Sequence, residues 1–332
     1  MEWIDIARGI GIVLVVYGHA LRSLYPTTPP HTGWPVWQDT LIYSFHMPLF
    51  FVLSGLFIGR GLARGRGPFI QNKLLTVAYP YFLWSLISGV TEVLADQWVN
   101  TPLSLSDIAR IPIQPIEQYW FLYALFVDQM IICALFTRRR LLIGVTLLGV
   151  VAVMAFGAGD IFTRSLGSLP YVVLGMLGGG ALGRAAEWPV RRLAAMALAA
   201  WATFALYHLA GPTGLAGALA HYGGALAGTL GTVALAMLIG RAGLGRMLKL
   251  LGQASMAIYV MHTLASAGLR ILLMHGLHLR EPMTLLVLST IIGLLAPLLV
   301  CRFAQRHGLA TLLGLDRGAR HAQAPAAIPA TS

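Results

Sequence analysis

The chain has 332 residues, of which 57% are hydrophobic and only 11% are charged. About 25% of the residues of an ordinary soluble domain are charged, so this composition excludes an ordinary water-soluble protein. The formal net charge is +11, but the basic residues lie in short segments between apolar runs, where membrane orientation accounts for them. No basic segment is interleaved with aromatic residues as in nucleic-acid binding sites. We therefore expect no nucleic-acid partner.

Apolar runs of about 20 residues, long enough to cross the hydrocarbon core, recur along the chain. They predict an all-α, polytopic integral membrane bundle of about ten transmembrane helices. The expected spans are 4–24, 39–59, 73–95, 118–136, 141–157, 165–183, 193–209, 219–240, 252–274 and 283–301. The N-terminal segment lacks a basic region and a small-residue cleavage site, so we expect the first run to remain as a span.

The positions of Lys and Arg predict an orientation. With these spans, 17 basic residues fall in the connections on one side and 4 on the other. Because basic residues are retained in the cytoplasm, both termini are expected there, in a multi-pass protein of the cytoplasmic (inner) membrane surrounded by its lipids. Residues 1–302 are expected to form one transmembrane domain. The Ala-, Pro- and Arg-rich tail, 303–332, is expected to be a disordered cytoplasmic segment.

Ionisable residues inside a span are costly and therefore indicate function. The first span contains Asp5, Arg8 and His19. Arg8 and His19 lie within roughly 20° of one helix face and about 16 Å apart along the axis. The second span contains His46, at a depth similar to that of His19. Helix–helix hydrogen bonding is the alternative role for a single histidine, and Arg8 alone could extend to the interface. The matched pair favours a shared site.

Three further segments complete a familiar pattern. Residues 45–55 read Phe-His-Met-Pro-Leu-Phe-Phe-Val-Leu-Ser-Gly, residues 119–126 read Tyr-Trp-Phe-Leu-Tyr-Ala-Leu-Phe, and residues 252–262 read Gly-Gln-Ala-Ser-Met-Ala-Ile-Tyr-Val-Met-His. Together with the Arg-x10-His spacing of Arg8 and His19, they resemble the acyltransferase-3 family of membrane O-acyltransferases. The Phe-His-Met-Pro form is most similar to the fucose 4-O-acetylase-like branch.

This resemblance implies a reaction and its substrates. The expected donor is a cytoplasmic acyl-CoA, in most members acetyl-CoA, and the expected acceptor is a hydroxyl of a cell-surface or lipid-linked carbohydrate. Transfer needs a base for the hydroxyl proton, a task that suits histidine. We expect His19 to be the base, His46 to be a second acid/base or positioning group, and Arg8 to bind the donor, because arginine suits phosphate geometry.

Other residues are candidates for lining this site. Ser255, Tyr259 and His262 follow helical spacing on one face of the ninth span and could either line the site or join helices. Asp5, Tyr119 and Trp120 are further candidates. The two cysteines, Cys133 and Cys301, lie in apolar runs and provide neither a disulfide framework nor a metal motif, so no metal and no permanently bound cofactor is expected.

Two other functions remain open from the sequence. Intramembrane Arg and His with Gly-rich helices also suit a transporter or flippase for a lipid or small solute. No internal repeat supports that alternative. A non-catalytic relative that binds polysaccharide or a partner enzyme is the third possibility, and the presence of Arg8, His19 and His46 together counts against it.

Overall fold

The computed structural model describes residues 1–25, 33–98, 102–157 and 159–315. Within these ranges every regular element is a helix, which confirms the predicted all-α class. Ten segments are long and apolar enough to span a membrane, as predicted: Glu2–Ser23, Trp34–Leu62, Arg66–Leu94, Glu117–Leu135, Arg139–Phe156, Ile161–Ala185, Val190–Ala210, Ala216–Arg241, Ser255–Gly276 and Pro282–Arg306.

The second and third spans are each built from several helices and begin before the expected boundaries. The second consists of α2 (Trp34–Gly55) and α3 (Ile58–Leu62). The third consists of α4 (Arg66–Lys73), the π-helical turn η1 (Leu74–Ala78) and α5 (Tyr79–Leu94). Hydropathy underestimates their length because the added turns are polar or basic while the backbone hydrogen bonding continues through them.

The remaining elements follow in chain order. They are α1 (Glu2–Ser23), η2 (Asp96–Trp98), α6 (Leu105–Arg110), η3 (Glu117–Tyr119), α7 (Trp120–Leu135), α8 (Arg139–Phe156), α9 (Ile161–Ala185), α10 (Val190–Ala210), α11 (Gly214–Arg241), α12 (Arg246–Gln253), α13 (Ser255–Ile271), η4 (Leu272–Gly276) and α14 (Pro282–Arg306). Asp160 caps α9, and hydrogen bonds from the Thr163 side chain and backbone hold the pKa of its carboxyl below the ordinary value.

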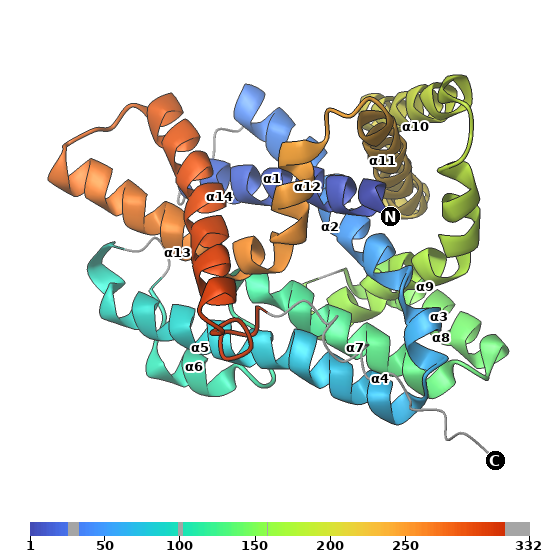
Figure 1. Cartoon of the computed structure of the whole chain (residues 1–332), viewed down its shortest axis with the longest axis horizontal. Helices are drawn as coiled ribbons and strands as arrows, with labels where there is room; N and C mark the ends of the chain where they lie inside the picture. Colours follow the sequence, from blue (N-terminus) through green and yellow to red (C-terminus); the bar gives the residue numbers. More distant parts are fainter. Residues whose placement is uncertain (26–32, 99–101, 158, 316–332) are drawn as a thin grey trace, which may run out of the picture.

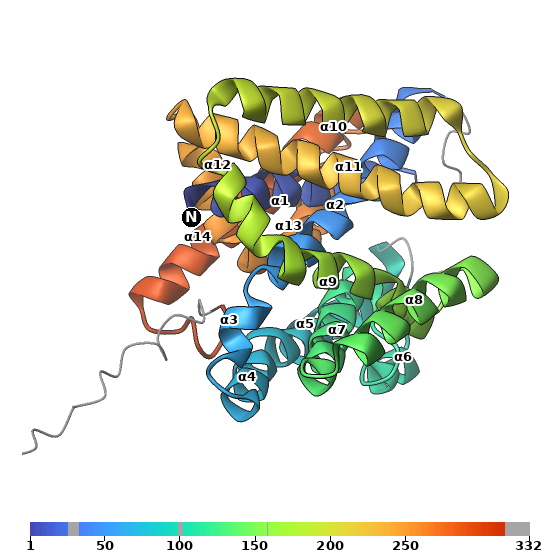
Figure 2. The same ribbon diagram turned by 90° about the vertical axis from the view of Figure 1, so that its right-hand side faces the viewer.

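Helix α1 lies at the centre of the bundle. It contacts α2, α11, α12, α13 and α14, and Figures 1 and 2 show it between α10–α11 on one side and α4–α8 on the other. In its most apolar stretch 61% of residues are buried, against 11% in α8 and 17% in α10. The peripheral helices therefore present apolar side chains to lipid, whereas α1 is enclosed by protein.

Two glycines allow α1 and α12 to pack backbone against backbone. A Cβ on Gly252 would lie 1.7 Å from the carbonyl oxygen of Asp5, and a Cβ on Gly9 would lie 2.0 Å from that of Leu248. Small residues at a crossing let membrane helices approach closely when no hydrophobic force drives them together. The N-terminal half of α1 is fixed by this contact.

Helices α2 and α9 cross in the same way. A Cβ on Gly55 would lie 2.2 Å from the carbonyl oxygen of Val172, and a Cβ on Gly175 would lie 2.1 Å from that of Val52. Gly175 thus permits this close crossing, whereas a Cβ on Gly178 of the same helix would meet nothing within 4 Å.

The two ends of the bundle differ in the connections they carry. In Figure 2 the N-terminus and α3 lie at the left end, and the connection between α10 and α11 lies at the right end. The left end thus includes the basic segment from Arg60 to Lys73. This position agrees with the predicted orientation, in which the connection between the second and third spans lies on the same side as the N-terminus.

The structure corrects the first part of the predicted disordered tail, 303–332. Helix α14 continues to Arg306, and the chain then packs against α5. The Tyr79 hydroxyl donates to the Leu312 carbonyl at 2.6 Å, and the Trp84 indole N–H donates to the Leu313 carbonyl at 2.9 Å. Leu315 is buried. The sequence did not predict this packing, because the short Leu-rich stretch 309–315 was assessed together with the polar remainder of the tail. Residues 316–332 lie outside the described residues.

The α2–α9 crossing predicts a sharp difference between two glycines of one helix. Gly175→Val should lower stability by at least about 1–3 kcal/mol because its side chain must displace the Val52 backbone. Gly178→Val should stay close to wild type. The unfolding midpoint of the detergent-solubilised protein measures both, and equal midpoints for the two variants would contradict the crossing.

Candidate functional site

Three histidines and one tyrosine, from three helices, are linked by a continuous series of ring contacts. The ring centroids of His19 in α1 and His262 in α13 are 5.1 Å apart, with an interplanar angle of 68°. Tyr43 of α2 lies 6.1 Å from His19 and 4.7 Å from His46. The structure thus brings together the two predicted histidines, with Tyr43 between them, and adds His262 as a direct neighbour of His19. We call His19, Tyr43, His46 and His262 the histidine cluster.

Backbone hydrogen bonds fix the orientation of two of these rings. His46 Nδ1 lies 2.7 Å from the Ile42 carbonyl oxygen, and His262 Nδ1 lies 2.8 Å from that of Tyr259. A carbonyl only accepts, so Nδ1 carries the proton in the neutral ring and Nε2 is left as an acceptor. The Nε2 atom of His262 is buried and has no hydrogen-bond partner among the described residues.

Exposure separates His19 from the other two histidines. His46 is 1% exposed and His262 is 0% exposed, whereas His19 is only partly buried. Of the three histidines, His19 is therefore the one that keeps some exposed surface. No cluster of three His, Cys, Asp or Glu side chains in the described part of the chain is arranged to hold a metal ion.

An arginine closes the cluster on the side of the connection between α1 and α2. The Arg22 guanidinium carbon lies 3.1 Å from the centre of the Tyr43 ring. Two parallel hydrogen bonds of 2.6 and 2.9 Å join Arg22 to Asp39, the bidentate geometry that holds a guanidinium firmly. Sequence reasoning missed Tyr43 and Arg22, although each lies three residues from a motif histidine and so on a neighbouring part of its helix.

Arg8 lies toward the other end of α1, about 16 Å from His19 along the helix. Its guanidinium carbon is 5.4 Å from the centre of the Phe57 ring. Lys73 lies within electrostatic range of both Arg8 and Arg64. These three cations form a basic cluster that the sequence indicated only through Arg8. Arg64 and Lys73 were not among the predicted site residues, because their approach to Arg8 depends on how α4 and the turn before it pack.

Several predicted lining residues join helices instead of facing the histidine cluster. Asp5 accepts a hydrogen bond of 3.2 Å from Gln253 across the α1–α12 crossing. The Tyr119 hydroxyl is within 2.8 Å of Ser88 and donates to the Val260 carbonyl at 2.7 Å. Ser255 starts α13, about 10 Å along the helix from His262. Asp5 and Ser255 therefore lie away from the three histidine rings, and the Tyr119 hydroxyl is engaged in contacts between helices.

Tyr259 combines both roles. Its hydroxyl donates to the Gln118 carbonyl, and its ring lies 6.2 Å from that of His262. Gln118 in turn donates to Thr263 at 2.8 Å. The η3 turn, directly before α7, is thus joined to α13 on both sides of His262, which fixes the position of that ring.

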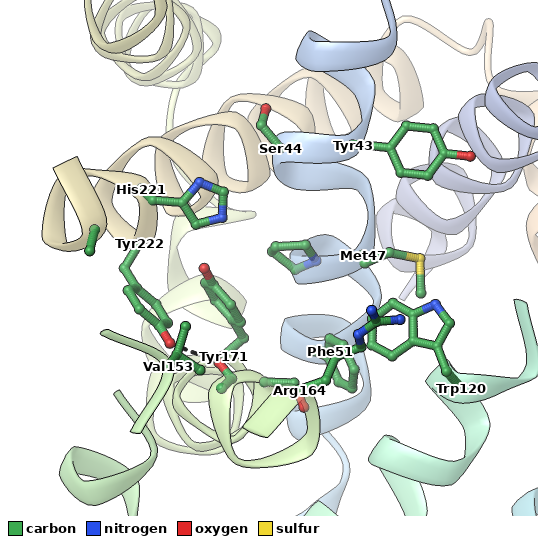
Figure 3. Close-up of a pocket in the computed structure, with 14 residues that line it drawn as sticks. Tyr43, Ser44, Met47, Phe51, Trp120, Val153, Arg164, Tyr171, His221 and Tyr222 are labelled. Atoms are coloured by element: carbon green, nitrogen blue, oxygen red, sulfur yellow. Dashed lines mark hydrogen bonds between the residues drawn. The ribbon is translucent and has the colours of Figure 1, made fainter. Parts of the chain in front are cut away.

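A cavity of about 460 Å³ lies on the other side of Tyr43. Its lining comes from α2, α7, α8, α9 and α11, and the residues drawn in Figure 3 include Trp120, the remaining predicted lining residue. Ser168, also in the wall, donates a 2.6 Å hydrogen bond to the buried carboxylate of Asp128. This hydrogen bond joins α9 to α7.

Comparison with known proteins gives a family match. A family model described as an acyltransferase domain matches residues 1–302. The nodulation protein NolL of Mesorhizobium japonicum is 31% identical over 152 residues, covering 45% of this chain and 39% of that protein. NolL of Sinorhizobium fredii is 30% identical over 123 residues, covering 36% and 32%. The match thus spans less than half the length of these curated relatives. No solved structure matches the chain.

Proposed function

Because the chain belongs to the acyltransferase-3 family, we propose that it is a membrane-bound O-acyltransferase that moves an acyl group, an acetyl group in the first instance, from acyl-CoA to a carbohydrate hydroxyl. The observation that carries this proposal is the histidine cluster. It gathers three imidazoles inside a membrane bundle, where polar groups are expensive unless they have a function.

His19 acts as the general base. In the transfer, the acceptor oxygen forms a bond to the thioester carbonyl carbon while His19 takes the hydroxyl proton. The carbon–sulfur bond then breaks, and the proton passes to the coenzyme A sulfur. The partial exposure of His19 supports this role, because the base must touch the acceptor hydroxyl.

His262 and His46 support His19 and do not replace it. Each is buried, with Nδ1 held by a backbone carbonyl. The unprotonated Nε2 of His262, next to the His19 ring, provides a lone pair that stabilises the imidazolium formed when His19 takes the proton. His46 holds Tyr43 against His19 through its edge-to-face contact.

The basic cluster binds the donor. Arg8, Arg64 and Lys73 gather three positive charges at the basic end of the bundle, as phosphate groups require. The distance of about 16 Å from Arg8 to His19 along α1 suits the pantetheine arm, which separates the phosphates of coenzyme A from its thioester. In this arrangement the donor enters at the basic end and delivers its acyl group to the histidine cluster.

The basic end faces the cytoplasm in this proposal, and the membrane is the cytoplasmic (inner) one. The excess of basic residues at this end supports the orientation, as does the cytoplasmic origin of acyl-CoA. The carbohydrate then reaches the histidine cluster from the opposite end.

Orientation can be measured with single introduced cysteines, because the native Cys133 and Cys301 are both buried. Ser106→Cys should react with a membrane-impermeant maleimide on intact cells, and Arg139→Cys should react only after permeabilisation. Labelling of Arg139→Cys on intact cells would reverse the proposed orientation.

Removal of the base should reduce turnover without unfolding the protein. His19→Gln is expected to lower kcat by about 10²- to 10⁴-fold, measured as transfer of labelled acetyl from acetyl-CoA to membrane or surface carbohydrate.

If His19 and His46 act in one unit, the activity of the double variant falls by less than the product of the two single losses. The exposed His275→Gln is the matched control. Wild-type activity in folded His19→Gln refutes the role, and lack of transfer by the wild type across a broad acceptor panel favours the transporter.

Donor binding should depend on the basic cluster and not on the base. Arg8→Ala is expected to weaken acetyl-CoA binding by about tenfold or more, whereas His19→Gln should bind the donor nearly as well as wild type. Arg191→Ala removes an exposed arginine from the same end of the bundle and serves as control. Equal dissociation constants for wild type and Arg8→Ala, measured by calorimetry, would contradict the donor site.

A further inference from the structure

Tyr43 is the member of the histidine cluster to which the proposed mechanism gives no chemical task. Its ring lies 6.1 Å from that of His19 and 4.7 Å from that of His46. Resting on the proposed function, we infer that Tyr43 is a catalytic residue, whose hydroxyl donates the hydrogen bond that stabilises the negative charge on the thioester carbonyl oxygen during transfer. In this inference Arg22 is a positioning residue that holds and polarises Tyr43.

The Tyr43 hydroxyl is a hydrogen-bond donor that the fold does not use. Its oxygen is buried and has no hydrogen-bond partner among the described residues. Such groups are rare inside proteins, because the loss of water without a new partner costs free energy. The hydroxyls of Tyr119 and Tyr259, by contrast, both donate to backbone carbonyls. An oxygen of a bound substrate would give Tyr43 the acceptor that it lacks.

The hydroxyl is directed toward the helix that carries the base. In Figure 3 the phenol oxygen of Tyr43 is turned away from His221 and toward α1. The Tyr43 ring meets the His19 ring edge-to-face, with an interplanar angle of 63°. His19 can then act on the attacking oxygen while Tyr43 acts on the carbonyl oxygen, because the two oxygens are bonded to the same carbon in the tetrahedral intermediate.

Arg22 places a positive charge against the same ring. Its guanidinium carbon lies 3.1 Å from the centre of the Tyr43 ring, an arrangement in which the cation attracts the π electrons. Arginine carries only donors, so this contact leaves the tyrosine proton available to a ligand. A positive charge at the ring polarises the O–H bond and thus strengthens the hydrogen bond that the hydroxyl gives to an anionic oxygen.

Asp39 holds Arg22 in this position. It lies four residues, about one helical turn, before Tyr43 on α2 and accepts the two hydrogen bonds of 2.6 and 2.9 Å from Arg22. Tyr43 is therefore held from two sides, by Arg22 and by the His46 ring. A donor that is fixed before the reaction stabilises the transition state without a cost of reorganisation.

The step balances with Tyr43 as a donor that keeps its proton. The acceptor oxygen forms a bond to the thioester carbon while His19 takes the hydroxyl proton, and the π electrons of the carbonyl move onto its oxygen. Tyr43 donates a hydrogen bond to that oxygen. The electrons then return to form the ester carbonyl, the carbon–sulfur bond breaks, and the sulfur takes the proton from His19.

Tyr43→Phe tests this role, because it removes the hydroxyl and keeps the ring that contacts both histidines. We expect kcat for acetyl transfer by the full-length protein to fall by about 10²- to 10³-fold. The dissociation constant for acetyl-CoA should stay close to that of the wild type, because the negative charge develops only during the reaction. Tyr17→Phe is the matched control on α1, since it removes a hydroxyl that already has a partner, Gln38, and should leave kcat nearly unchanged.

Two further variants separate catalysis from packing. 3-Fluorotyrosine at position 43 makes the hydroxyl a stronger donor and should raise kcat, whereas a hydroxyl that only supports packing would give no increase. Arg22→Gln should lower kcat by about tenfold in the wild type but have little further effect in Tyr43→Phe, because Arg22 acts through the tyrosine hydroxyl. Arg280→Gln removes another exposed arginine as a control.

Wild-type kcat in Tyr43→Phe with an unchanged unfolding midpoint, an equal loss in Tyr17→Phe, or no increase with 3-fluorotyrosine would each overturn the catalytic role of Tyr43. Full multiplication of the Arg22→Gln and Tyr43→Phe losses would overturn the positioning role of Arg22. Lack of acetyl transfer by the wild type is a distinct result, because it overturns the proposed function from which the inference starts.

Discussion

The close crossing of α1 and α12 determines where the polar groups of this bundle can lie. Gly9 and Gly252 bring the two backbones into direct contact, and α1 is then enclosed by α2, α11, α13 and α14 as well. Only a helix enclosed in this way can carry Asp5, Arg8 and His19 through a membrane, because an ionisable side chain facing lipid costs several kcal/mol. Both ends of the proposed reaction path depend on this one helix.

Polar side chains inside the bundle fall into two groups. Tyr119 and Tyr259 donate their hydroxyl protons to backbone carbonyls of a neighbouring segment, so they join η3 to α13. His262 makes backbone hydrogen bonds within its own helix and keeps a buried, unused nitrogen. Unsatisfied buried groups are rare in proteins and cost free energy. The contrast supports the proposal that His262 belongs to the site, whereas the Tyr119 hydroxyl bonds join helices of the framework.

The sequence predicted what depends on local periodicity and hydropathy. The ten spans follow from apolar length, and the common face of Arg8 and His19 follows from one uninterrupted helix, α1. Contacts between helices distant in the chain were not accessible in this way. The approach of His262 to His19 needs the packing of α13 on α1, and the cavity needs five helices at once. The structure of residues 303–315 was not predicted, because disorder was inferred from the composition of the whole segment 303–332.

The central place of α1 has a consequence for biogenesis. This helix is the first to be synthesised, but α11 to α14, four of the five helices that enclose it, are the last. Until they are inserted, the ionisable residues of α1 lack their final neighbours, and the earliest span depends on sequence more than 200 residues downstream. A chain halted before α12 lacks three of these five helices, so Arg8 and His19 bear the cost of incomplete enclosure until synthesis is finished.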